Sequence, residues 1–432
     1  MRVCVSRVVA MLLLCVGTAV HAQLVIEITK GQANAIPIAV VPFGMEGQGA
    51  ASVDFAAVVA GDLARSGRFA PLERRDMTDH PTSGEQIKFQ DWKYLKSDYI
   101  VVGKSVPEGD RTVVQFELYN VLNGQRLIGQ RLPTTASSQR MTAHRIADLI
   151  FQQITGIPGA FATRIAFVSM EGVPPNQRYK LLVSDSDGES QQIIADSMQP
   201  LMSPAWSPDG QSLAYVSFES KNAAIYVQTL QSGERRRVSA RAGINGAPAW
   251  SPDGKKIALT LSRKDGDVDV YTMELASQVL TRMTFDPGID TEPVWSADAQ
   301  KIYFTSDRAG GPQIYEVAVD NPNQLRRITY EGSYNARARL SPDGKSIAVV
   351  HQDGGNFRIA IFDLNSRNVQ VLTQGRQDES PSFAPNGATL IYATQDRGRG
   401  VLATVSVDGQ FQQRLASSRG DVREPVWSPY PK

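Results

Sequence analysis

Short apolar segments with strand-like alternation recur along the second half of the chain. Each series begins with a large apolar residue placed before a Ser-Pro-Asp-Gly or related turn, and successive series are 43 to 45 residues apart. These large residues are Trp206, Trp250, Trp295, Leu340, Phe383 and Trp427. Four strands fit one repeat, at 205–207, 212–218, 223–230 and 234–239. A repeat of this length with four strands predicts the blade of a β-propeller.

The two ends of the repeat region predict how the propeller closes. Segments 164–169, 179–184 and 191–195 resemble the second, third and fourth strands of a blade, but no inner-strand motif precedes them. The missing inner strand is found at 424–428. We therefore expect six blades, with the carboxy-terminal strand completing the first, because closure removes exposed strand edges. Pro204 is expected to open its inner strand, where a missing N–H group matters least.

Residues 23–160 follow a different pattern, with apolar positions at both helical and strand spacing. Asn123-Gly124 is a strong turn signal between two alternating segments, and Gly156 with Pro158 ends a helical pattern. The predicted elements are strands at 36–43 and 99–106, a hairpin of 111–121 with 125–132, and helices at 52–66 and 137–155. This predicts an α/β amino-terminal domain over 23–160, followed by an all-β six-bladed propeller over 161–432.

The first 22 residues have the order of a secretory signal peptide: Arg2 and Arg7, then a short apolar run, then small residues ending at Ala22. Cys4 and Cys15 both lie within it, so the remaining chain has no thiol or disulfide chemistry. The formal charge of +1 disfavours nucleic-acid binding, which needs a surplus of basic residues. These features predict a soluble, monomeric protein in an exported compartment.

Enzyme chemistry is disfavoured by the residues present. The chain has no Gly-x-Ser-x-Gly motif, and only His80, His144 and His351 remain after the signal peptide, each in a different segment. We expect no catalytic residue, no metal site and no cofactor, and His144 is interpreted as an ordinary helix histidine. One alternative stays open, because propellers gather carboxylates at the channel mouth: a hydrolase or lactonase that uses them.

Recognition is expected in the variable loops that lead into the inner strands. In a four-stranded antiparallel blade these loops share one face, and the short, nearly identical Ser-Pro-Asp-Gly turns share the other. Variable loops on a rigid scaffold commonly carry binding residues. The candidate partner-binding residues at this channel mouth are Met202, Ser203, Ile244, Asn245, Thr291, Glu292, Asn335, Asp378 and Glu379.

The amino-terminal segment carries a second candidate contact. Leu24, Val25, Ile26, Glu27 and Ile28 alternate as a strand would, and polar residues separate them from the first strand of the α/β domain. The segment could add to the sheet edge of a partner through main-chain hydrogen bonds. It could equally be an edge strand packed on its own domain.

The signal peptide, the 36–43 strand with its sequence Ile-Pro-Ile-Ala-Val-Val-Pro-Phe, and the Trp-Ser-Pro repeats in this order resemble the TolB family of the Tol-Pal system. The resemblance covers essentially the whole chain. It implies a non-catalytic periplasmic scaffold that supports outer-membrane integrity and constriction at division. The implied partners are the peptidoglycan-associated lipoprotein Pal at the propeller, TolA at the amino-terminal segment, and further outer-membrane lipoproteins and colicins, with peripheral membrane association through these partners.

Two loops carry this resemblance to the Pal-contacting residues. Thr291-Glu292-Pro293 matches one family segment, and Asn245-Gly246-Ala247-Pro248 matches its neighbour. The family has a histidine immediately before that Asn-Gly pair, whereas this chain has Ile244. The expected contact at this point is therefore apolar instead of hydrogen-bonded.

Overall fold

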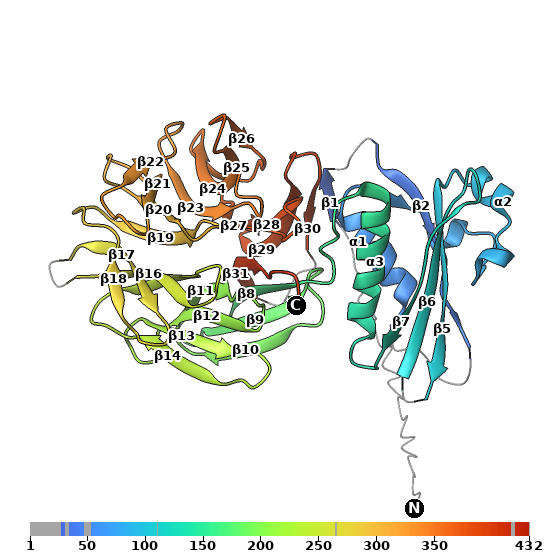
Figure 1. Cartoon of the computed structure of the whole chain (residues 1–432), viewed down its shortest axis with the longest axis horizontal. Coiled ribbons are helices and arrows are strands. Elements are labelled where there is room, and N and C mark those ends of the chain that lie inside the picture. Colours follow the sequence, from blue (N-terminus) through green and yellow to red (C-terminus); the bar gives the residue numbers. More distant parts are fainter. Residues whose placement is uncertain are drawn as a thin grey trace, which may run out of the picture.

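The computed structural model describes residues 27–30, 34–46, 53–109, 111–263, 266–415 and 420–431. An α/β domain lies beside a six-bladed propeller, which confirms the predicted fold class (Figure 1). The predicted signal peptide at 1–22 lies outside the described residues, as do Leu24, Val25 and Ile26 of the amino-terminal segment.

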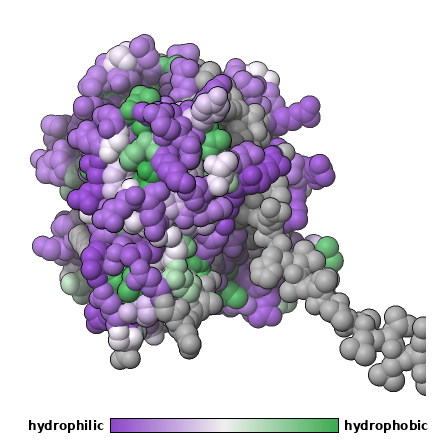
Figure 2. Space-filling model, turned by 90° about the vertical axis from the view of Figure 1, so that its right-hand side faces the viewer, coloured by the Kyte–Doolittle hydropathy of each residue, from purple (hydrophilic) through white to green (hydrophobic). Residues whose placement is uncertain are grey.

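The side of the α/β domain that faces away from the propeller is mainly hydrophilic, with small separate hydrophobic areas (Figure 2). Among the described residues, no helix is long and apolar enough to cross a membrane.

Each blade is a four-stranded antiparallel sheet, numbered here in chain order. Blade 1 consists of β31 (Asp421–Trp427), β8 (Arg164–Glu171), β9 (Arg178–Asp185) and β10 (Gln192–Ser197). Blade 2 consists of β11 (Leu201–Trp206), β12 (Ser212–Ser217), β13 (Ala224–Thr229) and β14 (Arg235–Ser239). Blade 3 consists of β15 (Asn245–Trp250), β16 (Lys256–Ser262), β17 (Val268–Glu274) and β18 (Leu280–Arg282).

The remaining three blades repeat this arrangement. Blade 4 consists of β19 (Asp290–Trp295), β20 (Lys301–Ser306), β21 (Gln313–Ala318) and β22 (Leu325–Arg327). Blade 5 consists of β23 (Asn335–Leu340), β24 (Ser346–Asp353), β25 (Asn356–Asp363) and β26 (Val369–Val371). Blade 6 consists of β27 (Glu379–Phe383), β28 (Thr389–Asp396), β29 (Arg399–Ser406) and β30 (Gln412–Arg414).

The carboxy-terminal strand closes the ring as predicted. β31 pairs antiparallel with β8, with Asp421 opposite Met170 and Trp427 opposite Ile165. The indole Nε1 of Trp427 also donates a hydrogen bond of 2.8 Å to Thr163 Oγ1. The first blade is therefore held together by residues from both ends of the propeller sequence.

The inner strands are longer than the sequence predicts, and Pro204 lies within its strand instead of opening it. β11 begins at Leu201, and its register with β12 shifts between Met202 and Ala205. Ser203 has φ of +52° at this irregularity. Because the hydrogen-bond ladder is interrupted at such a bulge, the missing N–H group of proline costs nothing there.

Tryptophans of the inner strands join neighbouring blades. Nε1 of Trp206, Trp250 and Trp295 each donates a hydrogen bond of 3.1 Å to a main-chain carbonyl on the inner strand of the preceding blade. The acceptors are the carbonyls of Val426, Ala205 and Ala249, respectively. The repeated tryptophan therefore packs blade against blade.

The α/β domain is a sheet in the order β4-β2-β5-β6-β7, with a short β3 paired to β5. Its strands are β2 (Ile36–Val40), β3 (Gly44–Met45), β4 (Phe69–Pro71), β5 (Tyr99–Glu108), β6 (Arg111–Asn120) and β7 (Arg126–Thr134). Its helices are α1 (Phe55–Arg65), α2 (Phe89–Tyr94) and α3 (Gln139–Thr155), with short 3₁₀ turns η1 (Arg74–Asp76) and η2 (Gly84–Gln86).

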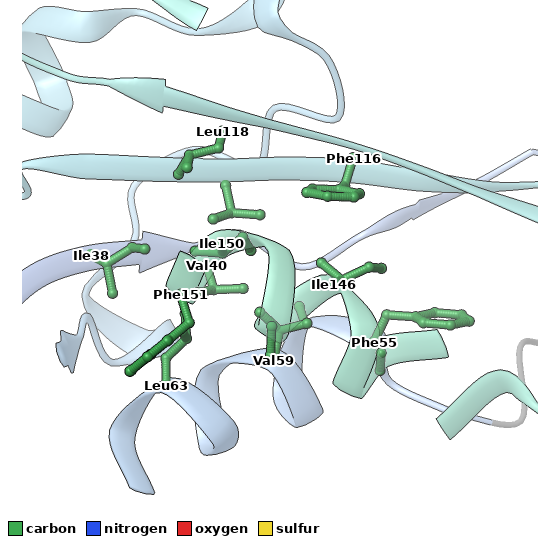
Figure 3. Close-up of a cluster of buried hydrophobic side chains, with 14 of the residues drawn as sticks. Ile38, Val40, Phe55, Val59, Leu63, Phe116, Leu118, Ile146, Ile150 and Phe151 are labelled. Atoms are coloured by element: carbon green, nitrogen blue, oxygen red, sulfur yellow. The ribbon is translucent and has the colours of Figure 1, made fainter. Parts of the chain in front are cut away.

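Helices α1 and α3 cover one face of this sheet and lie between it and the propeller (Figure 1). Their apolar residues meet alternate residues of β2 and β6 in a buried core (Figure 3). The core includes Val59 and Leu63 from α1, Ile146 and Ile150 from α3, and Phe116 from β6. The other face of the sheet packs against Trp92 of α2.

The described part of the amino-terminal segment differs from one of the two expectations, an edge strand packed on its own domain, while addition to the sheet of a partner stays a prediction. β1 (Glu27–Lys30) does not pair with its own domain; it adds antiparallel to β30 of blade 6, with Glu27 opposite Arg414 and Ile28 opposite Gln413. β30 is the outermost strand of its blade, so it offers unpaired main-chain groups that an added strand can use. Blade 6 thereby becomes a five-stranded sheet.

Candidate partner-binding site

The propeller has one face that the α/β domain leaves free. The α/β domain contacts turns on the opposite face: Asn386 Nδ2 donates a 3.0 Å hydrogen bond to the Pro158 carbonyl, and Ser186 Oγ donates one of 2.7 Å to the Phe161 carbonyl. Both propeller residues lie in turns between strands one and two or three and four of a blade. We call the other face, formed by loops that lead into the inner strands, the mouth face.

Large apolar side chains are exposed on this mouth face at consecutive blade junctions. Ile244 is 46% exposed, and its loop is held rigidly because its N–H group donates a 2.7 Å hydrogen bond to Ser262 Oγ. We name the set the apolar crescent; it comprises Met198, Met202, Ile244, Phe285, Ile289 and Tyr330. Exposed apolar groups gathered on one face are typical of protein–protein contact sites.

A ring of six residues with positive φ lies below the crescent, one in each inner strand. Each sits at the register irregularity of its strand, and φ ranges from +45° to +57°. We name this the channel ring: Ser203, Ala247, Glu292, Arg337, Ser380 and Glu424. All six line a central cavity of about 290 Å³. Positive φ is unfavourable for residues other than glycine, so the bulge must be held by the surrounding strands.

Arg337 of the channel ring pairs with both glutamates of the ring, Glu292 and Glu424. Arg337 Nε donates a 2.8 Å hydrogen bond to Glu292 Oε1, and the Arg337 main-chain N–H donates one of 3.0 Å to Glu292 Oε2. Thr305 Oγ1 donates a further 3.0 Å bond to Glu292 Oε2. Glu424 accepts from the Ser203 N–H group and lies 3.6 Å from the Arg337 guanidinium. Burial lowers the pKa of Arg337, but the charges of Glu292, Glu424 and Glu379 outweigh burial and raise it.

A pocket of about 570 Å³ opens beside the ring between blades 5 and 6. The rings of Tyr334 and Phe357 meet edge to face at 5.1 Å in its wall. Glu379, Asp421 and Arg423 also line it, so this part of the mouth face is polar and charged. The mouth face therefore combines an apolar side with a polar one.

The structure separates the nine predicted mouth residues into two groups. Met202, Ile244 and Glu379 are exposed, and Ser203, Thr291 and Glu292 are partly exposed, with Thr291 and Glu292 within β19 and not in a loop as expected. The other three, Asn245, Asn335 and Asp378, are at most 1% exposed.

The three buried residues shape the loops instead of presenting a contact surface. Asn245 Oδ1 accepts hydrogen bonds from Ser239 Oγ and the Arg241 N–H group, at 2.6 and 2.9 Å. Asp378 similarly accepts from Thr394 Oγ1 at 2.6 Å and from the Gly375 N–H group at 3.1 Å. Asn and Asp hold loops well because a short polar side chain can satisfy nearby main-chain groups. Direct contact of these side chains with a partner is therefore not expected.

Sequence reasoning missed Arg337, Ser380 and Glu424 of the channel ring. A signal was present, since each lies at the repeat position that Ser203, Ala247 and Glu292 occupy, 43 to 45 residues apart. The side chains at this position differ completely in chemistry. The shared feature is the main-chain bulge, which cannot be predicted from the residue type at this position.

One histidine and two aspartates within the described residues are spaced closely enough to share an ion. Ligand atoms of Asp62, His144 and Asp187 lie within 4.8 Å of one another, but this cluster is at the boundary of the two domains and not in the channel. Arg65 and Arg140 contact the same carboxylates. The cluster is therefore best described as an ion-pair network.

Comparisons with known proteins agree with this architecture. A family profile described as the TolB amino-terminal domain matches residues 24–127, and one described as the TolB beta propeller domain matches residues 151–431. A protein of Xanthomonas campestris pv. campestris (strain B100) described as Tol-Pal system protein TolB is 49% identical over 411 residues, covering 94% of this chain and 93% of its own length. The counterpart of Xanthomonas euvesicatoria pv. vesicatoria is 48% identical over 429 residues, covering 98% and 97%.

Similarity extends to a solved structure. The crystal structure of TolB from Acinetobacter baumannii has a TM-score of 0.87 and 42% sequence identity, covering 94% of this chain and all of that one. Two family profiles, near-full-length relatives and this structural match all agree in domain order. The chain therefore belongs to the TolB family of the Tol-Pal envelope system.

Proposed function

We propose that this protein is a non-catalytic periplasmic scaffold that binds Pal through the mouth face of the propeller and TolA through its amino-terminal segment. In this role it supports outer-membrane integrity and constriction at division. The observation that carries the Pal proposal is the apolar crescent, which lies on the propeller face that the α/β domain leaves free. Family membership supports the choice of partners.

The amino-terminal part of the proposal is supported by β1. Its pairing with β30 demonstrates that residues 27–30 can add to a sheet edge in extended form. Strand addition of this kind uses main-chain hydrogen bonds, which a sheet edge of a partner offers equally well. Glu27 and Ile28 would then leave β30 and, together with Leu24, Val25 and Ile26, pair with a sheet edge of TolA.

The channel gives little support to the alternative, a hydrolase or lactonase. Both carboxylate oxygens of Glu292 already accept hydrogen bonds from Arg337 or Thr305. A general base needs a free lone pair directed at the substrate proton. The pairing with Arg337 is more typical of a group that maintains the shape of the channel.

The Pal proposal is tested by calorimetric titration of the soluble Pal domain into the chain that starts at Gln23. Ile244→Asp places a charge in the apolar crescent, which would be desolvated on binding, so we expect affinity to fall at least about tenfold. Thr291→Arg adds bulk beside the channel ring and should also reduce binding. The Ile244→Asp variant should unfold within about 0.5 kcal/mol of wild type, as is usual for surface changes.

Val279→Asp is the matched control, because Val279 is an exposed aliphatic residue in a turn on the opposite face of the propeller. It should bind Pal like wild type. Equal affinity of the Ile244→Asp variant and this control would refute the mouth face as the Pal site. Recovery of no lipoprotein from detergent-solubilised envelopes, combined with turnover of a periplasmic substrate, would favour the enzyme alternative.

The TolA proposal is tested by a variant that starts at Asn34. We expect it to fold, to bind Pal and to lose TolA binding, because it lacks Leu24, Val25 and Ile26 as well as β1. Retention of TolA binding by this variant would place the TolA contact elsewhere on the chain.

A further inference from the structure

A buried charged cluster joins the two domains at the face opposite the mouth face. His144, from the middle of α3, is fully buried. Asp62 of α1 lies on one side of its ring, and Asp185 at the end of β9 and Asp187 in the turn after β9 lie on the other. These four side chains come from both domains, and the mouth face uses none of them.

Both ring nitrogens of His144 face carboxylates. Nδ1 lies 2.7 Å from Asp62 Oδ2. Nε2 lies 3.6 Å from Asp185 Oδ2 and 3.9 Å from Asp187 Oδ2, and has no closer partner among the described residues. A neutral imidazole has one donor nitrogen and one acceptor nitrogen, so one nitrogen would face a carboxylate with its lone pair. Only the imidazolium, which carries a proton on each nitrogen, presents an N–H group to the carboxylates on both sides of the ring.

Charge counting within the cluster agrees with a protonated ring. Asp62, Asp185 and Asp187 supply three negative charges, and Arg65 and Arg140 supply two positive ones. A protonated His144 supplies the third positive charge and makes the cluster neutral. Charge balance is needed because an unpaired buried charge is strongly unfavourable. A divalent cation in place of the proton would leave an excess positive charge. The other charged groups near these residues are Asp148, which influences His144, and Arg164, which influences Asp185.

We propose that the buried imidazolium of His144 locks the α/β domain onto blade 1 and thereby fixes the relative orientation of the two domains. This inference goes beyond the proposed partner binding and does not depend on it. His144 contacts no proposed partner surface, so it is a positioning residue.

The direction of the pH dependence follows from the same contacts. Burial lowers the pKa of His144, but the charge of Asp62, the nearby carboxylate of Asp185 and the hydrogen bond to Asp62 outweigh burial and raise it to about 10. The folded-state pKa is thus above the unfolded value of about 6.5. The stabilisation is complete below about pH 6.5 and is lost as the pH rises through about 10. The lock therefore holds at acidic and neutral pH.

The charge state is tested first by imidazole NMR of the chain that starts at Gln23. This chain has three histidines, His80, His144 and His351, so substitution of His80 and His351 by Asn assigns every signal. We expect the His144 signal to keep its imidazolium position from pH 6 to about pH 9. The pKa of His351 is lowered by burial, so its signal should instead lie at the neutral imidazole position over this pH range. A His144 midpoint near the ordinary value of about 6.5 would overturn the proposal.

The orientation is tested by double electron–electron resonance. The chain from Gln23 has no cysteine, so Lys93→Cys in α2 and Lys255→Cys in blade 3 give one label on each domain at exposed positions. We expect a single narrow distance distribution at pH 7, and a broader or displaced one when His144→Gln is added. Arg145→Gln removes a positive charge from the exposed neighbouring position of α3 and should leave the distribution unchanged.

Asp187→Asn provides the same test from the propeller side if the His144→Gln protein does not fold. It should broaden or displace the distribution as well. An unchanged narrow distribution in either folded variant would overturn the lock. Addition of Zn²⁺ alone should leave the His144 NMR signal in place; a saturable shift would overturn the imidazolium assignment in favour of a metal site.

Discussion

Individual residues at the mouth face divide by burial in a way that sequence alone does not reveal. Ile244 and Asn245 are adjacent, yet one is exposed on the surface and the other is buried within its loop. The loop turns between them, and that turn is set by Asn245, which accepts hydrogen bonds from Ser239 Oγ and the Arg241 N–H group and donates one to the Arg241 carbonyl. Exposure of Ile244 was predictable from its place in a variable loop; burial of Asn245 depends on three-dimensional contacts.

Arg337 should contribute to stability through its place in the channel ring. Arg337→Gln removes the guanidinium that contacts Glu292 and leaves a partly buried carboxylate without its charge partner. We expect a loss of about 1–2 kcal/mol of unfolding free energy, below the 3–5 kcal/mol of fully buried pairs because Arg337 is 31% exposed. Urea denaturation measures this loss. A variant as stable as wild type would show that the pair contributes nothing.

Asp148 should make stability fall as the pH rises from acidic to neutral. Burial raises the pKa of its carboxyl to about 7, although the N–H groups of Phe161 and Ala162 lower it. The folded-state pKa lies above the unfolded value, so the folded chain binds more protons between about pH 4 and 7 and stability declines across that range. Asp148→Asn should remove this decline. The unfolding free energy of both proteins would be measured by denaturation from pH 4 to 8. The same pH dependence in both proteins would contradict a raised pKa of Asp148.

At the scale of elements, the repeat determined how much could be predicted. The blade count and closure by β31 followed from the repeat. Each blade needs four strands, the first blade lacked its inner strand in the sequence, and the one unassigned inner-strand motif was at the carboxy-terminal end. Short elements were not predicted: α2 has six residues and β3 has two, and neither is long enough to show a period. The pairing of β1 with β30 joins residues almost 390 positions apart, which no local pattern encodes.

Closure by β31 should be essential for the stability of the propeller. Removal of residues 424–432 takes away Trp427 and most of the partner of β8, leaving an open strand edge. We expect a loss of several kcal/mol, comparable with deletion of a large core side chain, measured as a lower thermal midpoint. Removal of only residues 431–432 is the control and should change little. A 424–432 deletion that melts like wild type would contradict closure by this strand.

At the scale of the whole molecule, the two proposed contacts are separated. The α/β domain covers turns at blades 1 and 6 on one face, and β1 follows the outer edge of blade 6. The mouth face lies on the other side of the propeller, away from these contacts. A protein of this shape can engage one partner at the mouth face while its amino-terminal segment engages another.

Hydrogen–deuterium exchange with and without the soluble Pal domain tests the mouth-face proposal most directly. Pal should slow exchange in the loops that carry the apolar crescent, at residues 198–203, 240–246, 284–292 and 329–336, while the Ser-Pro-Asp-Gly turns and the sheet of the α/β domain exchange as before. Protection confined to those turns or to the α/β domain, or no protection at saturating Pal, would contradict the proposal.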